Sequence, residues 1–386
     1  MRILKLILKN SLRHKLRTFL TILGMSIAVM AFGVLRTVVE MWYEGVEAAA
    51  PNRLITRHAV SFIFPLPYSY REQIAKVPGI ETVSFANWFG GTYIDKNKFF
   101  ARMAVDPETI FDVYPEFIID AKELETFKRE RNSCIVGYEI AKQYGFKIGD
   151  IIPLDGDIYP GKWEFVVRGI YKPRTQSTDA TQMLFHFSAV DERMKVEMPG
   201  REGLIGWYIV KIKDPNQAGT ISDQIDALYK NSSNATKTET ERAFTQSFIS
   251  GLNSLLAAMN FVSFVIIGII MLVLGNTMIM SARERIQEYA VLKTLGFSGG
   301  HLIGLILGES LVISAFGAGL GLFLTYTVVA TIAAIVPKGF FPYFFITPTT
   351  LILSATSALS IGLLASIFPI QRAIGTKIVD GLRHIG

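Results

Sequence analysis

The stretch Leu255–Met280 reads LLAAMNFVSFVIIGIIMLVLGNTMIM and contains no charged residue. A helix needs roughly 20 apolar residues to cross the ~30 Å hydrocarbon core of a bilayer, so this stretch predicts a transmembrane helix. Working outward, three further apolar stretches repeat the pattern, at Thr18–Val39, Leu302–Ile335 and Thr349–Ile370. We therefore predict an integral membrane protein with four membrane helices, over residues 18–40, 251–280, 302–336 and 349–370.

Most of the basic charge lies in three short segments beside these stretches. Residues 1–17, 281–301 and 371–386 together hold 12 Lys and Arg against three acids. Short loops rich in Lys and Arg stay on the cytoplasmic side, so we predict that these three segments are cytoplasmic. Residues 41–250 and the short aromatic loop 337–348 then lie outside. The net charge of +6 thus reflects membrane orientation and gives no support to nucleic-acid binding.

A cleavable signal peptide is the alternative for the first apolar stretch, because small residues follow at Ala48–Ala50. The apolar run is longer than the roughly 7–15 residues of such peptides, and charged residues separate it from those alanines. We predict an uncleaved anchor.

The segment 41–250 alternates strand and helix patterns, which predicts a mixed α/β domain. We expect strands at Asn52–Ala59, Glu81–Asn87, Phe99–Val105 and Gly206–Ile212. Helices are expected at Tyr68–Val77 and Ala218–Tyr229, with a last helix running from Thr238 into the second membrane helix. The middle, 121–199, has the pattern of a compact β-rich insert between the flanking parts 41–120 and 200–250.

The sequence lacks the motifs of an enzyme. No G-x-x-x-x-G-K-[ST], H-E-x-x-H or G-x-S-x-G motif is present, and the five histidines are scattered. We therefore predict no catalytic residue, no metal site and no cofactor in this chain. The single cysteine, Cys134, is expected to be a small apolar residue in a strand. Any energy for mechanical work must come from a partner, because the spans lack the intramembrane charges of ion-coupled carriers.

The segment Met280–Ser298 continues the second span as an amphipathic helix that Gly296 terminates. Its periodicity alone leaves a solvated connector and a partner-docking helix equally open.

This segment resembles the loop E-R-x-x-E-(I/Y)-x-V-L-(K/R)-x-L-G of the MacB/FtsX-type (type VII) ABC permeases, which include macrolide exporters and lipoprotein-release (Lol) relatives. Other parts of the chain are similar to further motifs of that family in the same order, namely Asn10–Val29, Val77–Val83, Ala141–Asp150, Gly308-Glu309 with Gly317–Gly321, and Pro369–Ala373 with Asp380–Arg383. Each motif is weak alone, but the ordered set covers nearly the whole chain.

The resemblance implies a permease subunit in the bacterial inner membrane that pairs as a homodimer or heterodimer. It also implies two separate ATPase subunits, which bind ATP and Mg, because family exporters often carry a fused ATPase and this chain begins at its first span. The periplasmic domain would have a ferredoxin-like part (Porter) with an inserted β-rich part (Sabre). ATP-driven motion would reach that domain through the membrane helices, a behaviour called mechanotransmission. Further implied partners are a periplasmic adaptor, an outer-membrane channel, a lipoprotein or lipid.

The family's coupling loop assigns ATPase contact to one set of residues here: Arg283, Glu284, Glu288, Tyr289, Leu292, Lys293 and Gly296. We expect Tyr289 and Leu292 to be apolar knobs in a groove of the ATPase.

Three further features have a structural and a functional interpretation. Small residues recur at Gly317 and Gly321 and at Ser354, Ala358, Gly362 and Ser366, which predicts helix packing within the chain or a dimer seam. Glu309 lies inside the third span, where a carboxylate indicates a function or pairs with a basic residue at the membrane rim. The aromatic residues Phe62, Phe64, Tyr68 and Tyr70 are expected to be packing residues or a contact patch for a periplasmic partner.

Two classes of function remain open. One is a transport permease that exports or extracts a substrate across the envelope. The other is an FtsX-like regulator whose motion switches a periplasmic cell-wall enzyme without transport. The length of the external domain favours the first.

Overall fold

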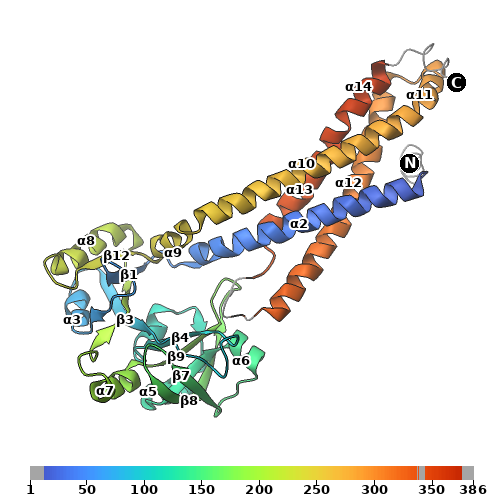
Figure 1. Ribbon diagram of the computed structural model, residues 1–386. Coiled ribbons are helices and arrows are strands. Elements are labelled where there is room, and N and C mark those ends of the chain that lie inside the picture. Colours follow the sequence, from blue (N-terminus) through green and yellow to red (C-terminus); the bar gives the residue numbers. More distant parts are fainter. Residues whose placement is uncertain (1–12, 337, 339–343, 376–386) are drawn as a thin grey trace. The chain divides into compact units, whose positions relative to one another are not determined.

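The computed structural model describes residues 13–336, 338 and 344–375, and it divides into two units. The membrane unit comprises residues up to Glu40, 253–332 and those from Phe344 onward; the α/β unit comprises Met41–Leu252 and Ala333–Tyr343. Both are drawn in Figure 1. Predictions that concern residues 1–12, 337, 339–343 and 376–386 lie outside the described residues. They include the basic N-terminal segment, most of the aromatic loop and the C-terminal tail.

The membrane unit contains helices that are long and apolar enough to cross a bilayer. They are α2 (Lys15–Ala48), α10 (Asn253–Glu284), α12 (Gly299–Ile335), and α13 (Pro348–Ala365), which α14 (Ile367–Gly375) continues. A short helix, α11 (Ile286–Thr294), joins α10 to α12. These elements confirm the four predicted membrane helices.

Small residues bring α12 close to its neighbours α2 and α13. A Cβ atom placed on Gly321 would lie 2.6 Å from the Cβ of Val29, so α2 packs directly on the backbone of α12. On the α13 side, the Ser310 hydroxyl donates to the carbonyl oxygen of Gly362 at 2.5 Å. Gly317 lies equally close to Met25 of α2. Ser354, Ala358 and Ser366 are buried within the chain. The small residues thus make contacts inside one subunit, and a dimer seam stays a prediction.

Gly321→Val is expected to destabilise the membrane unit, because the added side chain would force α2 away from α12. Overpacking of this kind costs about 1–3 kcal/mol. Gly319→Val is the matched control, since nothing lies within 4 Å of its Cβ position. The measurement is the thermal unfolding temperature of each variant in the same detergent. Equal unfolding temperatures for the two variants would contradict the packing described here.

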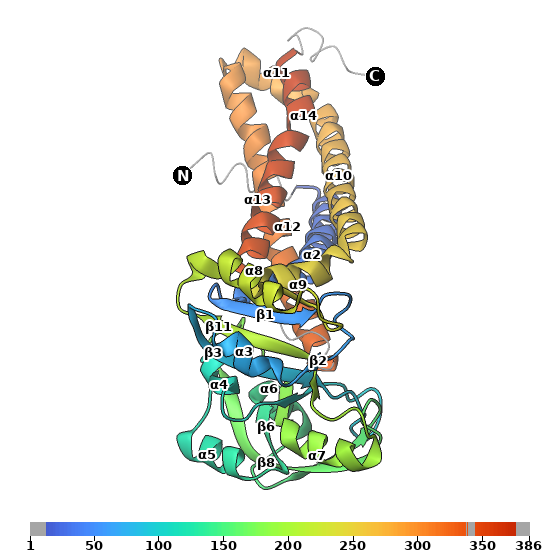
Figure 2. The ribbon, with the colours of Figure 1, turned by 90° about the vertical axis from the view of Figure 1, so that its left-hand side faces the viewer.

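Four strands and two helices of the α/β unit form a ferredoxin-like arrangement. The strands are β1 (Arg53–His58), β3 (Ile80–Trp88), β11 (Trp207–Ile212) and β12 (Thr236–Thr240), and the helices are α3 (Tyr70–Ala75) and α8 (Ala218–Tyr229). The strand order is β12-β1-β11-β3, with antiparallel pairing throughout. Figure 2 shows β1, β11 and β3 side by side. This order is that of a split βαββαβ unit.

The remaining strands extend the same sheet rather than forming a second one. They are β4 (Ala101–Val105), β5 (Phe117–Ile118), β6 (Ser133–Gly137), β7 (Ile151–Gly156), β8 (Gly161–Pro173) and β9 (Gln182–His186). Strand β4 pairs with β3 on one side and in parallel with β9 on the other. The predicted insert 121–199 therefore lies within the longer segment that separates β3 from β11. A small separate ladder joins β2 (Leu66–Pro67) to β10 (Leu204–Ile205).

The insert contains the strands β6 to β9 together with α5 (Ala121–Arg129), α6 (Tyr138–Tyr144) and α7 (Phe187–Glu197), while α4 (Ile110–Val113) precedes it. One sequence expectation about secondary structure is wrong. The last helix does not start at Thr238, which belongs to β12. That segment places β-branched threonines at alternate positions, a pattern that suits a strand. The hydroxyl of Thr240 then caps α9 (Glu241–Ser250) by accepting from the Ala243 N–H.

Candidate functional site

The junction between α10 and α11 turns at a single residue, Arg285. Its backbone (φ −108°, ψ 11°) leaves the helical region, so the two helices meet at a bend. At the other end of α11, Gly296 adopts φ +89°, a left-handed conformation that favours glycine. The N–H groups of Gly296 and Phe297 donate to the carbonyl oxygens of Lys293 and Leu292, both at 3.1 Å. This is a Schellman cap, and it confirms the predicted role of Gly296.

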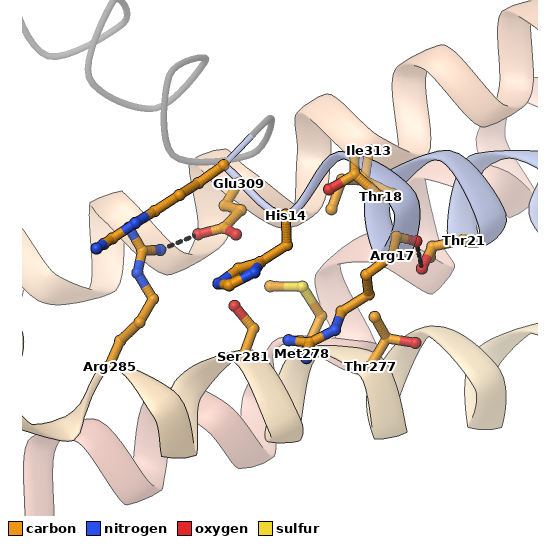
Figure 3. Close-up of a pocket in the computed structure, with 11 residues that line it drawn as sticks. His14, Arg17, Thr18, Thr21, Thr277, Met278, Ser281, Arg285, Glu309 and Ile313 are labelled. Atoms are coloured by element: carbon orange, nitrogen blue, oxygen red, sulfur yellow. Dashed lines mark hydrogen bonds and ion pairs between the residues drawn. The ribbon is translucent and has the colours of Figure 1, made fainter.

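Arg285 forms a buried ion pair with Glu309 of α12. Its Nη1 lies 2.7 Å from Glu309 Oε2, and both side chains are less than a tenth exposed. Figure 3 shows the two groups pointing toward each other at the edge of a small cavity. Arg285 Nε also contacts Glu288 Oε2 at 3.2 Å. The basic partner expected for Glu309 is therefore Arg285.

Two more arginines connect the start of α2 to the same junction. Arg17 donates to both carboxylate oxygens of Glu284, at 2.6 and 2.7 Å. Arg13, just before α2, pairs with Glu288. Arg13 and Arg17 are four residues apart, as are Glu284 and Glu288. These pairs are partly exposed and contribute little to stability. They link the start of α2 to the last residue of α10 and to α11.

The ionised state of the junction follows from its surroundings. Burial alone would lower the pKa of Arg285, but Glu309, Tyr289 and Glu288 together outweigh it and raise that pKa. Burial alone would raise the pKa of Glu288, but Arg13 and Arg285 outweigh it and hold the pKa below its ordinary value. Burial raises the pKa of Tyr289 to about 12, so its hydroxyl stays neutral. Arg285 and Glu288 are therefore charged at neutral pH.

Helix α11 also contacts the end of α14. The ammonium of Lys293 donates to the carbonyl oxygen of Ile374 at 2.9 Å. The segment 284–294 is thus connected to the start of α2 and to α12 by ion pairs, to α14 by this hydrogen bond, and to α10 by the chain itself.

The two apolar residues predicted to contact a partner do not project outward. Tyr289 is buried among the membrane helices with 3% of its surface exposed, so the expectation that it is an outward knob is wrong. Leu292 is half-buried and packs against the same core. The face of α11 that carries Tyr289 and Leu292 points inward because it packs against the membrane helices of the same chain. The exposed apolar side chains of α11 and of the turn that follows it are instead Val291 (45%), Leu295 (70%) and Phe297 (45%), which we call the α11 patch.

Of the other predicted coupling residues, one is exposed on the surface and three take part in ion pairs or hydrogen bonds. Arg283 is exposed, whereas Glu284, Glu288 and Lys293 are held by the contacts described above. Arg13, Arg17 and Arg285 were absent from the predicted site. The sequence contains a pattern that could have indicated Arg13 and Arg17. These two basic residues are four positions apart, and the acidic residues Glu284 and Glu288 have the same spacing.

The aromatic residues near the start of the α/β unit are mainly packing residues. Tyr70 stacks on Tyr229 with ring centroids 3.7 Å apart, and Phe62 packs on Trp207 at 4.7 Å. Tyr68 contacts Phe85 edge-to-face. Phe64 is half exposed. The set therefore does not form one contact patch.

Among the described residues, no group of three His, Cys, Asp or Glu side chains is placed to hold a metal ion. Cys134 is buried in β6, and burial raises the pKa of its thiol. It is therefore an unreactive core residue.

Comparison with known families covers both units. Residues 18–228 match the family described as MacB-like periplasmic core domain, and residues 260–378 match the FtsX-like permease C-terminal family. The chain belongs to the MacB/FtsX family of ABC transporter permeases. Its α/β unit is accordingly the extracytoplasmic domain of this family, and its helices are membrane-spanning. We use the name extracytoplasmic domain for the α/β unit below.

Two curated relatives of this MacB/FtsX family permease are themselves uncharacterised ABC transporter permeases. One, from Methanocaldococcus jannaschii, is 24% identical over 349 residues, which is 86% of this chain and 84% of the relative. The other, from Mycobacterium tuberculosis, is 23% identical over 263 residues, which is 68% of this chain but 30% of the relative.

Among solved structures, two extracytoplasmic regions are similar to part of the chain. The periplasmic region of MacB from Actinobacillus actinomycetemcomitans has a TM-score of 0.38 and 16% identity, covering 53% of this chain and 95% of that one. The extracellular domain of the ABC-type transporter YknZ from Gram-positive bacteria has a TM-score of 0.36 and 13% identity, covering 49% and 100%.

Proposed function

We propose that this chain is the non-catalytic permease subunit that passes ATP-driven motion from separate ATPase subunits to its extracytoplasmic domain. The motion would export or extract a substrate across the envelope. The assembly would contain two permease chains and two ATPase subunits, with ATP and Mg bound by the latter. The observation that carries the proposal is α11, a short helix tied to every membrane helix that leaves an apolar patch exposed.

The ion pairs of the junction support a mechanical role for α11. A push on the α11 patch would reach α12 through Arg285 and Glu309. It would reach the start of α2 through the pair of Arg13 with Glu288. Since these contacts are charged and short, they resist stretching better than a few apolar contacts would. The α11 helix is therefore suited to move the bundle as one body.

Two membrane helices lead directly into the extracytoplasmic domain, and a buried ionic cluster joins their connections there. Arg53, at the start of β1, follows α2, and Glu241, at the start of α9, precedes α10. Arg53 Nε lies 2.7 Å from Glu241 Oε2, and its Nη2 lies 2.7 Å from Glu116 Oε1. Arg53 is almost fully buried, so water does not compete for its ion pair with Glu241, and this pair would make the two connections move together. The pair of Arg53 with Glu116 would pass that motion toward β5.

The experiment that tests the proposal is to weaken the α11 patch and to measure how much ATPase remains bound to the purified permease. What co-purifies from the native membrane discriminates the role. An adaptor, channel or lipoprotein supports transport, whereas a cell-wall hydrolase indicates regulation.

The proposal requires α11 to be cytoplasmic, which cysteine labelling tests. We expect a membrane-impermeant maleimide to label Lys213→Cys in intact cells and Thr294→Cys only after the membrane is opened. Both positions are exposed, and the native Cys134 is buried and gives little background. The opposite pattern would place α11 on the wrong side of the membrane for an ATPase.

A further inference from the structure

A cleft of about 410 Å³ lies in the extracytoplasmic domain beside the loop between β1 and β2. Its size is within the roughly 300–1,000 Å³ of small-molecule sites. Its walls are mainly apolar and include Phe62, Ile63, Trp88, Ile158, Leu204 and Trp207. The sequence indicated only one of these residues, because the loop and strands that form the cleft are far apart in the chain.

Parts of the apolar wall face solvent. Ile63 is 88% exposed and Ile158 is 44% exposed. Exposed apolar side chains that gather around one cleft indicate a binding surface more strongly than isolated ones do. The aromatic rings of Phe62 and Trp207 pack on each other at 4.7 Å and give the cleft a rigid floor.

Polar side chains line part of the cleft, and Arg201 is the charged one among them. Arg201 lines the cleft, and in the described part of the chain its guanidinium has no ion-pair partner. Asp191 and Glu202 instead accept from the backbone N–H groups of Gly203 and Gly200, at 2.6 and 2.5 Å. The Arg201 guanidinium can therefore still pair with an anion in the cleft.

Two indole N–H groups add to these donors. Neither Trp88 nor Trp207 donates to an acceptor among the described residues, whereas Trp163 donates to the Tyr159 carbonyl oxygen at 3.0 Å. The amide of Asn87, by contrast, donates to the Tyr159 hydroxyl at 2.7 Å. The cleft thus combines apolar walls with N–H donors that make no hydrogen bond to a described residue.

We propose that this cleft binds an amphiphile that has one acyl chain and an anionic head group. The chain would lie along Phe62, Trp88 and Trp207, and a carboxylate or phosphate would pair with Arg201. A guanidinium suits either anion because its N–H groups can donate two parallel hydrogen bonds. The site is separate from α11, and binding to it requires no ATPase, so its test is independent of the proposed function.

The test uses the full chain in nanodiscs of phosphatidylcholine and a dansylated undecanoic acid as the probe. Energy transfer from the tryptophans to the dansyl group reports binding. We expect saturable binding of the acid and about tenfold weaker binding of its uncharged methyl ester. Arg201→Gln should weaken binding of the acid about tenfold and leave binding of the ester unchanged.

Arg131→Gln is the matched control, because Arg131 is an exposed arginine of the same domain that lies outside the cleft. It should bind both probes like the unmodified chain. Ile63→Ser should weaken the acid and the ester alike, since it removes part of the apolar wall. Displacement by oleate would identify a free fatty acid as the ligand type, and displacement by lysophosphatidylglycerol a membrane lipid. Absence of saturable binding, or equal binding of the acid to Arg201→Gln, would overturn the proposal.

Discussion

Val291→Ser combined with Leu295→Ser is expected to release the ATPase subunits from the permease while the membrane helices stay folded. Both side chains are exposed on α11, at 45% and 70%. Truncating an interface anchor typically costs about 2 kcal/mol. Two such losses would weaken ATPase binding by roughly a thousandfold. The measurement is the amount of ATPase that co-purifies in nanodiscs, together with its ATP turnover.

Two controls distinguish this effect from general damage. Val196→Ser with Leu228→Ser removes two exposed apolar side chains from the extracytoplasmic domain, and should leave the ATPase bound. Tyr289→Ala removes a buried ring and should lower the unfolding temperature instead, since truncating a large core aromatic costs about 3–5 kcal/mol. If the double α11 variant retains its full complement of ATPase, α11 is only a connector and the proposed coupling fails.

Arg285→Ala is expected to destabilise the membrane unit strongly. It leaves the carboxylate of Glu309 buried in α12 without a partner, and breaking a buried pair in this way costs about 3–5 kcal/mol. Replacing both residues, as Arg285→Met with Glu309→Leu, should restore most of the stability, because it removes the uncompensated charge. The measurement is thermal unfolding of each variant in the same detergent.

The exposed pair at the same junction provides the comparison. Arg17→Ala breaks the contact with Glu284, whose side chain is 40% exposed, and should cost about 1 kcal/mol or less. A similar small loss for Arg285→Ala would mean that Glu309 finds water or another donor, and that the buried pair is not what joins α11 to α12.

The membrane helices could be predicted from the sequence because their signal is local. Transfer of a continuous apolar run into a bilayer depends on the composition of that run. The spans predicted at 18–40, 251–280 and 302–336 correspond to α2, α10 and α12, and the span at 349–370 corresponds to α13 and α14. The cap at Gly296 is also local, since only its own backbone conformation is involved. The alternating pattern of 52–59 and 206–212 similarly predicted β1 and β11.

Which face of a helix points inward was decided only by the tertiary structure. Tyr289 of α11 and Leu295, which follows the last residue of that helix, are both large and largely apolar, so composition cannot tell the buried one from the exposed one. That choice depends on where α2, α12 and α14 lie. The partnership of Arg285 with Glu309 has the same origin, as does the cleft of the extracytoplasmic domain, which gathers residues from distant segments. Sequence by itself determined which segments enter the membrane, because burial in lipid is a property of a segment; contacts between segments determined the candidate sites.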